Sequence, residues 1–258
     1  MKKSGIIVLF CILAVATVMA QTPRDGFYFA QDAAYAGGLK NQVVLRVQGG
    51  KIASANWNRV TYSAGRADFK AEAAKGGEVA TWANNAKLVE DFLVSSQNLN
   101  ATSVSGVPAN FQVAPFFNLA KQAMASTAIA KGPYNKDGWY YADTPIDPDP
   151  NLGYNTRNTA LITVVNGTIV DALWNGIINY QGINPSKFIA SAEGKYPMVG
   201  SQAPWHTQAE RAAQALVRLG DPAKITMKAN KTPDAITGCT VIIKDFIEAS
   251  TKALQAAR

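Results

Sequence analysis

The 258-residue chain carries one sequence pattern twice. Residues 25–30 read Asp-Gly-Phe-Tyr-Phe-Ala, and residues 137–142 read Asp-Gly-Trp-Tyr-Tyr-Ala, 112 positions later. Further matches follow in the same order with growing offsets: 47–58 with 164–175, Trp82 with Trp205, and 105–106 with 237–238. This order indicates a tandem duplication. We therefore expect two domains of one fold, over residues 21–131 and 137–258, joined by the Gly- and Pro-containing segment 131–136.

Each copy has the pattern of an antiparallel hairpin. In the second copy, the β-branched and apolar runs 159–165 and 168–174 are joined by Asn166-Gly167, a pair that suits a type I′ turn. The first copy places Gly49-Gly50 there, which tolerates the same positive φ angles. The Pro-rich segment 144–150 predicts an exposed loop.

Helical patterns follow the hairpins. We expect helices over 83–94, 207–219 and 241–257, with Thr207 and Glu210 forming a capping box. No strand–helix–strand alternation supports a parallel sheet. The predicted fold class is therefore α+β, with two tandem domains that each contain an antiparallel sheet and packed helices.

The N-terminus has the pattern of a secretory signal peptide over residues 1–20. Lys2 and Lys3 precede an apolar run over 5–19, and small residues end at Ala20, where cleavage is expected. The run is too short for a transmembrane span. Cys11 raises a lipoprotein alternative, which the bulky Phe10 before it disfavours. We expect a mature protein that is secreted or periplasmic.

The residue inventory excludes several classes of function. The net charge of +7 is spread without a basic run, so nucleic-acid binding is not expected. His206 is the only histidine and is predicted to lie just before a helix, and cleavage would leave Cys239 as the only thiol. No metal site or catalytic residue is expected from such a set. Asp147 and Asp149 are expected to be solvated turn residues, with calcium binding as an alternative.

The segment 233–240, Pro-Asp-Ala-Ile-Thr-Gly-Cys-Thr, precedes the last predicted helix. A small, hydroxyl-rich turn at a helix start exposes unpaired N–H groups, which favour a phosphate or another anion. An ordinary N-cap made by Thr237 or Thr240 is the alternative from the residues alone.

At these residues the chain resembles the FMN-binding domain family, whose members often carry Asp-x-x-Ser/Thr-Gly-Ala-Thr. The match spans Asp234, Thr237, Gly238 and Thr240, with Cys239 at the usual Ala position. Other matching positions in the second copy are 137–140, 166–169, 195–198, Trp205, Gln208 and 245–246. Taken with the degenerate first copy, the resemblance covers nearly all of the mature chain.

The resemblance implies a cofactor-binding site made of Asp234, Thr237, Gly238, Cys239 and Thr240. It implies that a flavin transferase joins FMN to Thr240 through a phosphoester, and that the protein transfers electrons to a membrane or extracellular redox partner rather than acting on its own substrate. Candidate surfaces for the flavin ring are aromatic: Trp139, Tyr140, Trp174 and Trp205.

The first copy departs from the motif. Thr102, Val107 and Pro108 stand at the Asp, Ala and final Thr positions, so it lacks the acceptor hydroxyl and is expected to carry no covalent flavin. One alternative function is a flavin-free envelope or surface scaffold that keeps the duplicated fold. Another is a flavoenzyme that reduces a small acceptor, which the absence of an obvious proton donor disfavours.

Overall fold

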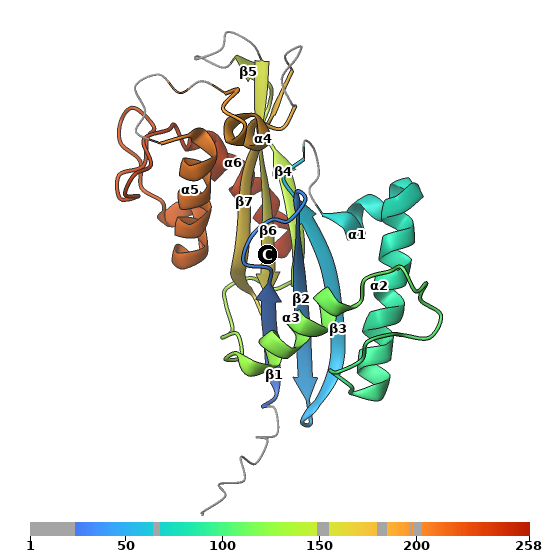
Figure 1. Cartoon of the computed structure of the whole chain (residues 1–258). Helices are drawn as coiled ribbons and strands as arrows, with labels where there is room; N and C mark the ends of the chain where they lie inside the picture. The colour runs from blue at the N-terminus through green and yellow to red at the C-terminus, as the bar shows by residue number, and fades with distance from the viewer. Residues whose placement is uncertain (1–23, 64–67, 149–154, 180–184, 197, 199–202) are drawn as a thin grey trace, which may run out of the picture.

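The structure is a computed structural model that describes residues 24–63, 68–148, 155–179, 185–196, 198 and 203–258. The predicted signal peptide lies outside the described residues. The elements, labelled in Figure 1, are β1 Gly26–Gln31, β2 Leu39–Gln48, β3 Lys51–Thr61, α1 Phe69–Glu72, α2 Gly77–Ser96, α3 Ala114–Ala125, β4 Gly138–Asp143, β5 Asp147–Pro148, β6 Asn155–Val165, β7 Thr168–Ile178, α4 Lys187–Ala192, α5 Trp205–Leu219 and α6 Lys244–Leu254, with short 3₁₀ turns at Ala73–Lys75, Pro222–Lys224 and Gln255–Ala257.

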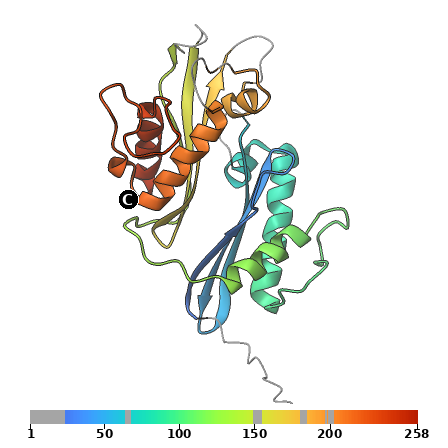
Figure 2. The ribbon, with the colours of Figure 1, turned by 60° about the vertical axis from the view of Figure 1, so that its left-hand side comes forward.

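The strands form two antiparallel sheets. The first has the order β1-β2-β3 and carries α2 and α3, while the second places β6 between β4 and β7 and carries α5 and α6. β5 pairs with the start of β6 and is exposed, so the segment predicted as a loop contains a two-residue edge strand. The two sheet-and-helix units lie side by side, joined by the extended segment after α3 (Figure 2). The predicted α+β class is confirmed.

The same hydrogen bonds recur at matching positions of the two units. Trp57 Nε1 donates to Asn41 Oδ1 over 3.1 Å, and Trp174 Nε1 donates to Asn158 Oδ1 over 2.9 Å. Each Trp is at most 2% exposed and contacts an aromatic ring from both covering helices: Trp82 and Phe116 in the first unit, Trp205 and Phe246 in the second. One core design therefore organises both copies.

Both hairpins turn where the sequence predicts. Asn166 and Gly167 have φ angles of 50° and 71°, and Gly49 and Gly50 have 60° and 71°. Two consecutive positive φ angles define the type I′ turn. An L side chain at either second position would be strained, which explains the glycine in both copies.

Three helix starts differ from the predictions. α2 begins at Gly77, six residues before the predicted start at 83. α5 begins at Trp205 after Pro204, so Thr207 and Glu210 lie inside the helix and the predicted capping box is wrong. The proline sets the start because its ring fixes φ and it needs no N–H partner. His206 is the second residue of α5 rather than a residue before it, and its Nδ1 lies 3.0 Å from Ser191 Oγ.

The helix α6 begins at Lys244, three residues later than predicted. Residues 241–243 have apolar side chains that fit the helical pattern, and Ile243 is fully buried. The N–H groups of Thr240 and Val241, however, donate to the side chain of Gln208. This tertiary contact holds the backbone in a loop before the helix.

The two units meet through a buried polar contact centred on Asp171 of β7. Its carboxylate accepts hydrogen bonds from Lys40 Nζ at 3.0 Å, Gln42 Nε2 at 2.7 Å and Gln31 Nε2 at 3.2 Å. Gln42 Oε1 in turn accepts from Trp139 Nε1 at 2.6 Å. These side-chain hydrogen bonds therefore join strands β1 and β2 to β4 and β7, and nearly all of the polar groups involved have partners.

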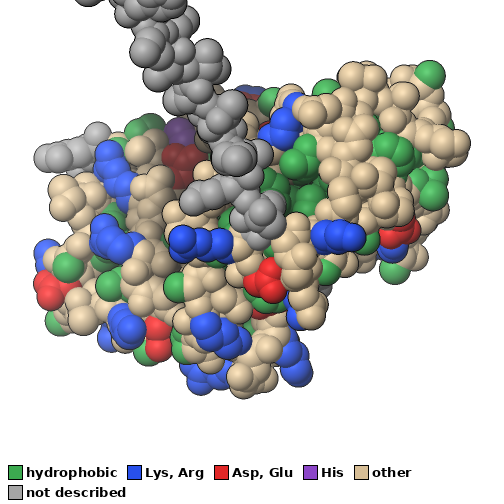
Figure 3. All heavy atoms as spheres, turned by 90° about the horizontal axis from the view of Figure 1, so that it is seen from below, with side chains coloured by type: hydrophobic (Ala, Val, Ile, Leu, Met, Phe, Trp, Pro, Cys, Tyr) green, Lys and Arg blue, Asp and Glu red, His purple; other side chains and the backbone are tan. Residues whose placement is uncertain are grey.

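The surface shows no concentrated charge on the face drawn in Figure 3, where Lys and Arg side chains are scattered among neutral atoms. Among the described residues, no helix has both the length and the apolar character needed to cross a bilayer. In the same part of the chain, no three His, Cys, Asp or Glu side chains are grouped as they would be around a metal ion. Asp149, one of the two loop aspartates, lies outside the described residues.

Candidate functional site

The predicted cofactor motif forms a tight turn ahead of α6. The Cys239 N–H donates to the Ile236 carbonyl over 3.1 Å, and Gly238 has a φ of +70°. The first copy makes the same turn, in which the Val107 N–H donates to the Val104 carbonyl over 3.2 Å and Gly106 has a φ of +81°. The turn itself is therefore a property of the shared fold.

Thr240 follows this turn and is fixed by a buried glutamine. Gln208 Oε1 accepts the Thr240 N–H at 2.7 Å and the Val241 N–H at 3.2 Å, and lies 3.2 Å from Thr240 Oγ1. Gln208 is 1% exposed, and its Nε2 donates to the Ala203 carbonyl over 2.8 Å. Thr240 is exposed. The Thr240 hydroxyl is thus presented at the surface, and the hydrogen bonds to Gln208 fix the backbone that carries it.

Two sequence expectations about this turn are wrong. The N–H groups of Cys239, Thr240 and Val241 all have acceptors, and α6 starts four residues after Thr240, so the turn is not a cluster of free donors at a helix end. The N-cap alternative also fails, because Ile243 is the N-cap of α6 and no side chain caps it.

The other motif residues have different environments. Asp234 and Thr237 are exposed, and the Asp234 N–H donates to the Thr226 carbonyl over 3.0 Å. Cys239 is 5% exposed, and burial raises the pKa of its thiol, opposed by a hydrogen bond from Val241. The cysteine therefore packs into the core as a small neutral side chain, as the usual alanine would.

An arginine that the sequence reasoning missed lies against the turn. Arg211 of α5 donates from Nη1 to the Gly238 carbonyl over 2.5 Å. A Cβ built on Gly238 would lie 2.3 Å from the same Nη1, so the arginine occupies the space that only glycine leaves. A positive charge is thus held two residues before Thr240.

The equivalent positions of the first copy carry none of this chemistry. Counting from the matched tryptophans Trp82 and Trp205, the positions of Gln208 and Arg211 are occupied by Asn85 and Leu88. Pro108 stands at the position of Thr240. The first copy therefore keeps the turn but lacks the hydroxyl, the longer amide and the cation.

The aromatic residues expected to hold a flavin ring are not exposed beside the motif. Trp174 and Trp205 are each 2% exposed and pack in the core. Trp139 is half-buried and bonds Gln42 in the contact between the units, and the half-buried Tyr140 donates its hydroxyl to the Lys136 carbonyl over 2.8 Å. The structure thus gives these four side chains structural contacts.

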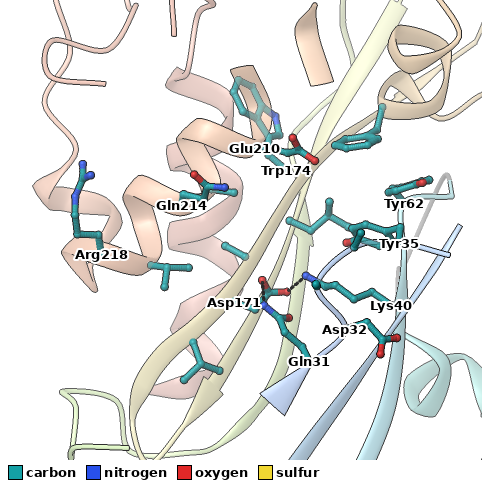
Figure 4. Close-up of a pocket in the computed structure, with 18 residues that line it drawn as sticks. Gln31, Asp32, Tyr35, Lys40, Tyr62, Asp171, Trp174, Glu210, Gln214 and Arg218 are labelled. Atoms are coloured by element: carbon teal, nitrogen blue, oxygen red, sulfur yellow. Dashed lines mark hydrogen bonds and ion pairs between the residues drawn. The ribbon is translucent and has the colours of Figure 1, made fainter. Parts of the chain in front are cut away.

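A second candidate site is a cavity of about 560 Å³ between the two units (Figure 4). Its walls are one face of α5, the strand β7 and the loop after β1. The lining residues are Gln31–Tyr35, Lys40, Tyr62, Val170–Trp174, Phe188, Glu210, Ala213, Gln214, Val217 and Arg218. This volume lies within the usual range for small-molecule sites, about 300–1,000 Å³.

Aromatic rings from both units form one side of the cavity. Tyr62 stacks on Phe188 with ring centroids 4.5 Å apart and planes at 15°, and Tyr35 lies 4.2 Å from Tyr62. Burial raises the pKa of Tyr35 well above its ordinary value, and the charge of Asp171 adds to this, so the phenol is neutral. Figure 4 shows Glu210 on the α5 side, across from the two tyrosines.

No protein-family model and no curated protein matches the chain. Two structures from structural genomics programmes show similarity. A solution NMR structure from Clostridium thermocellum is 40% identical, covers 48% of this chain and 93% of its own, and has a TM-score of 0.37. A crystal structure from Clostridium perfringens is 20% identical, covers 40% of this chain and 86% of its own, and has a TM-score of 0.30. Neither name states an activity or a ligand.

Proposed function

We propose that this protein is an extracytoplasmic flavoprotein that carries one FMN on Thr240 and transfers electrons to a redox partner. The observation that carries the proposal is the difference between the two copies at one turn. The second copy presents an exposed hydroxyl on Thr240, held by Gln208, with the Arg211 cation against the preceding carbonyl. The first copy has Pro, Asn and Leu at these three positions.

The residues present fit the phosphate end of FMN. Thr240 Oγ1 would form the ester, and its exposure leaves the hydroxyl open to a transferase. Arg211 supplies a positive charge close to the turn, which favours the singly charged phosphodiester that this linkage would form. Cys239 replaces the usual alanine without reaching the surface, because its side chain is buried. The bound flavin would supply reversible one- and two-electron transfer.

The chain's own contribution is to orient this hydroxyl. Gln208 uses its carbonyl oxygen for the Thr240 and Val241 N–H groups and its amide for the Ala203 carbonyl. A side chain held at both ends fixes the loop before any cofactor binds, so little conformational entropy remains to be lost there. The orientation of the Thr240 hydroxyl therefore depends on Gln208.

The test is peptide mapping of the mature protein from a host that supplies a flavin transferase. We expect the peptide containing Thr240 to carry the mass of FMN less one water, and Thr240→Val to lack it while folding normally. Thr237→Val is the matched control, because Thr237 is also exposed and lies in the same turn. Covalent flavin on the Thr240→Val protein, or its loss only from Thr237→Val, would contradict the assignment.

A flavin-free scaffold is the second candidate. It is favoured by the burial of Trp174 and Trp205, which leaves these two rings no free face for a flavin. In that case the native protein would be colourless, its mass would equal that of the mature chain alone, and its role would depend on the surfaces shared by both copies.

A further inference from the structure

The cavity between the units exists because the two copies fill one position differently. In the first unit, Glu90 of α2 is 4% exposed and points at the outer edge of β3. Its Oε1 accepts the backbone N–H of Trp57 at 2.6 Å and also bonds Lys70 Nζ at 2.6 Å. The Glu90–Lys70 ion pair therefore fills the space between α2 and β3, and Glu90 gives the Trp57 N–H a hydrogen-bond acceptor.

The second unit lacks both side chains. The offset between Trp82 and Trp205 places Ala213 at the position of Glu90. The N-cap residues of α1 and α4, which make equivalent bonds, place Phe188 at the position of Lys70. Ala213 and Phe188 both line the cavity.

By the shared register, this change leaves the Trp174 N–H directed at the space that Glu90 fills in the first copy. Trp57 pairs with Val43 and Trp174 pairs with Ala160 in the same register, so the two N–H groups point to the same side of their strands. The Trp57 N–H donates to the Glu90 carboxylate. In the described part of the chain, no acceptor outside the sheet is recorded for the Trp174 N–H. A buried N–H that gains an acceptor gains a hydrogen bond, so the cavity offers an anchoring point.

We propose that this cavity binds a small, flat, uncharged aromatic molecule whose carbonyl oxygen accepts the Trp174 N–H, as the Glu90 carboxylate accepts the Trp57 N–H. The rings of Tyr35, Tyr62 and Phe188 provide the surface for a flat ring. Quinones and the flavin ring system share this chemistry. The proposal does not depend on FMN at Thr240, because Thr240 does not line the cavity.

The charges of the walls favour a neutral ligand. Lys40 is already paired with Asp171, and the Asp32 carboxylate would repel an anion. Arg218 also lines the cavity, but Figure 4 shows it on α5, away from the two tyrosines. Glu210 stands on the α5 wall and would repel a carboxylate placed near Trp174. A cation would be attracted to Glu210 but has no acceptor for the N–H. A neutral carbonyl can accept the Trp174 N–H without placing a negative charge beside Glu210.

The experiment follows the backbone amide of Trp174 in the ¹⁵N-labelled mature chain by NMR during titration. The probes are 2,3-dimethyl-1,4-naphthoquinone, lumichrome as a flavin ring without phosphate, and 2,3-dimethylnaphthalene, which lacks carbonyls. We expect saturable shifts of the Trp174 amide with at least one carbonyl probe and at least tenfold weaker binding of the hydrocarbon. Which carbonyl probe binds more tightly identifies the source of the ligand.

The matched variant restores the filling of the first copy. Ala213→Gln places a neutral acceptor where Glu90 lies, so we expect it to weaken probe binding at least tenfold while the protein remains folded. Thr240→Val should bind the probes as wild type does, which separates this proposal from the flavin assignment. The proposal is overturned if neither carbonyl probe shifts Trp174, if the hydrocarbon binds equally well, or if a folded Ala213→Gln protein keeps full affinity. Should Ala213→Gln fail to fold, Ala213→Ser is the second variant, with a smaller loss expected.

Discussion

Asp171 is predicted to be the most important single side chain in the contact between the two units. The Asp171 and Lys40 side chains are 15% and 11% exposed, and two glutamines also donate to the carboxylate. Asp171→Ala would leave a buried ammonium without its partner. Removing one partner of a buried pair costs about 3–5 kcal/mol, and the remaining exposure places this pair at the lower end, about 3 kcal/mol.

The assay is urea unfolding of the mature chain followed by tryptophan fluorescence, to which Trp139 contributes from within the contact. A matched control is Asp143→Ala, because Asp143 pairs with Arg157 and Lys252 nearer to solvent and the substitution should cost less than about 1 kcal/mol. The double variant Lys40→Met with Asp171→Leu should recover most of the loss, since no charge then remains unpaired. A cost for Asp171→Ala similar to that of the control, or a strictly additive double variant, would refute the reasoning.

Three further predictions concern single residues. Gly238→Ala should destabilise the protein by about 1–2 kcal/mol because of its positive φ, and by a further amount because the new Cβ displaces Arg211. Gly106→Ala should carry only the cost of the positive φ. Equal losses of stability for the two variants in urea unfolding would contradict the arginine contact. Burial raises the pKa of Glu90 in the folded state above its ordinary 4.5, so the contribution of Glu90 to the free energy of unfolding falls as pH rises from 4.5 through the raised pKa. In unfolding measured across pH, Glu90→Gln should lose this pH dependence. Trp139→Phe should cost about 1 kcal/mol in thermal unfolding by removing its donor to Gln42, and no loss would mean that the bond contributes nothing.

The sequence predicts the fold well because local and tertiary preferences agree. Asn166-Gly167 permits a turn that the flanking strands also require, and both hairpins form where expected. The repeat predicts one core for both copies, and Trp57 and Trp174 confirm it with the same ring contacts and the same indole hydrogen bond. Signals that depend on residues next to each other in the chain are readable in this way.

The errors at the starts of α5 and α6 have different causes, one local and one distant in sequence. Thr207 and Glu210 have the spacing of a capping box, but Pro204 starts the helix one turn earlier. Residues 241–243 continue the helical pattern, but Gln208 holds the backbone before them in a loop. Periodicity counts apolar positions and cannot show that a glutamine 33 residues earlier accepts the Val241 N–H.

Comparing the copies position by position would have marked the Glu90 and Ala213 positions as worth examining. A buried glutamate facing a strand edge in one copy and an alanine in the other signals either a lost hydrogen bond or space for a ligand. Only the structure shows that Ala213 and Phe188 change together and that the other unit closes the space above them. Whether a substitution opens a cavity depends on such neighbours.

Both proposals depend on the same helix. Relative to α2, the helix α5 keeps its core tryptophan, and three of the positions that differ matter for the two sites: Asn85, Leu88 and Glu90 correspond to Gln208, Arg211 and Ala213. The first two differences add an amide and a cation to the turn that carries Thr240, and the third opens the cavity on another face of α5. A helix is about 10–12 Å across, so the two sites are close in space yet share no hydrogen bond. Substitutions at Thr240 and Ala213 should therefore act independently, whereas a change that shifts α5 should disturb both sites at once.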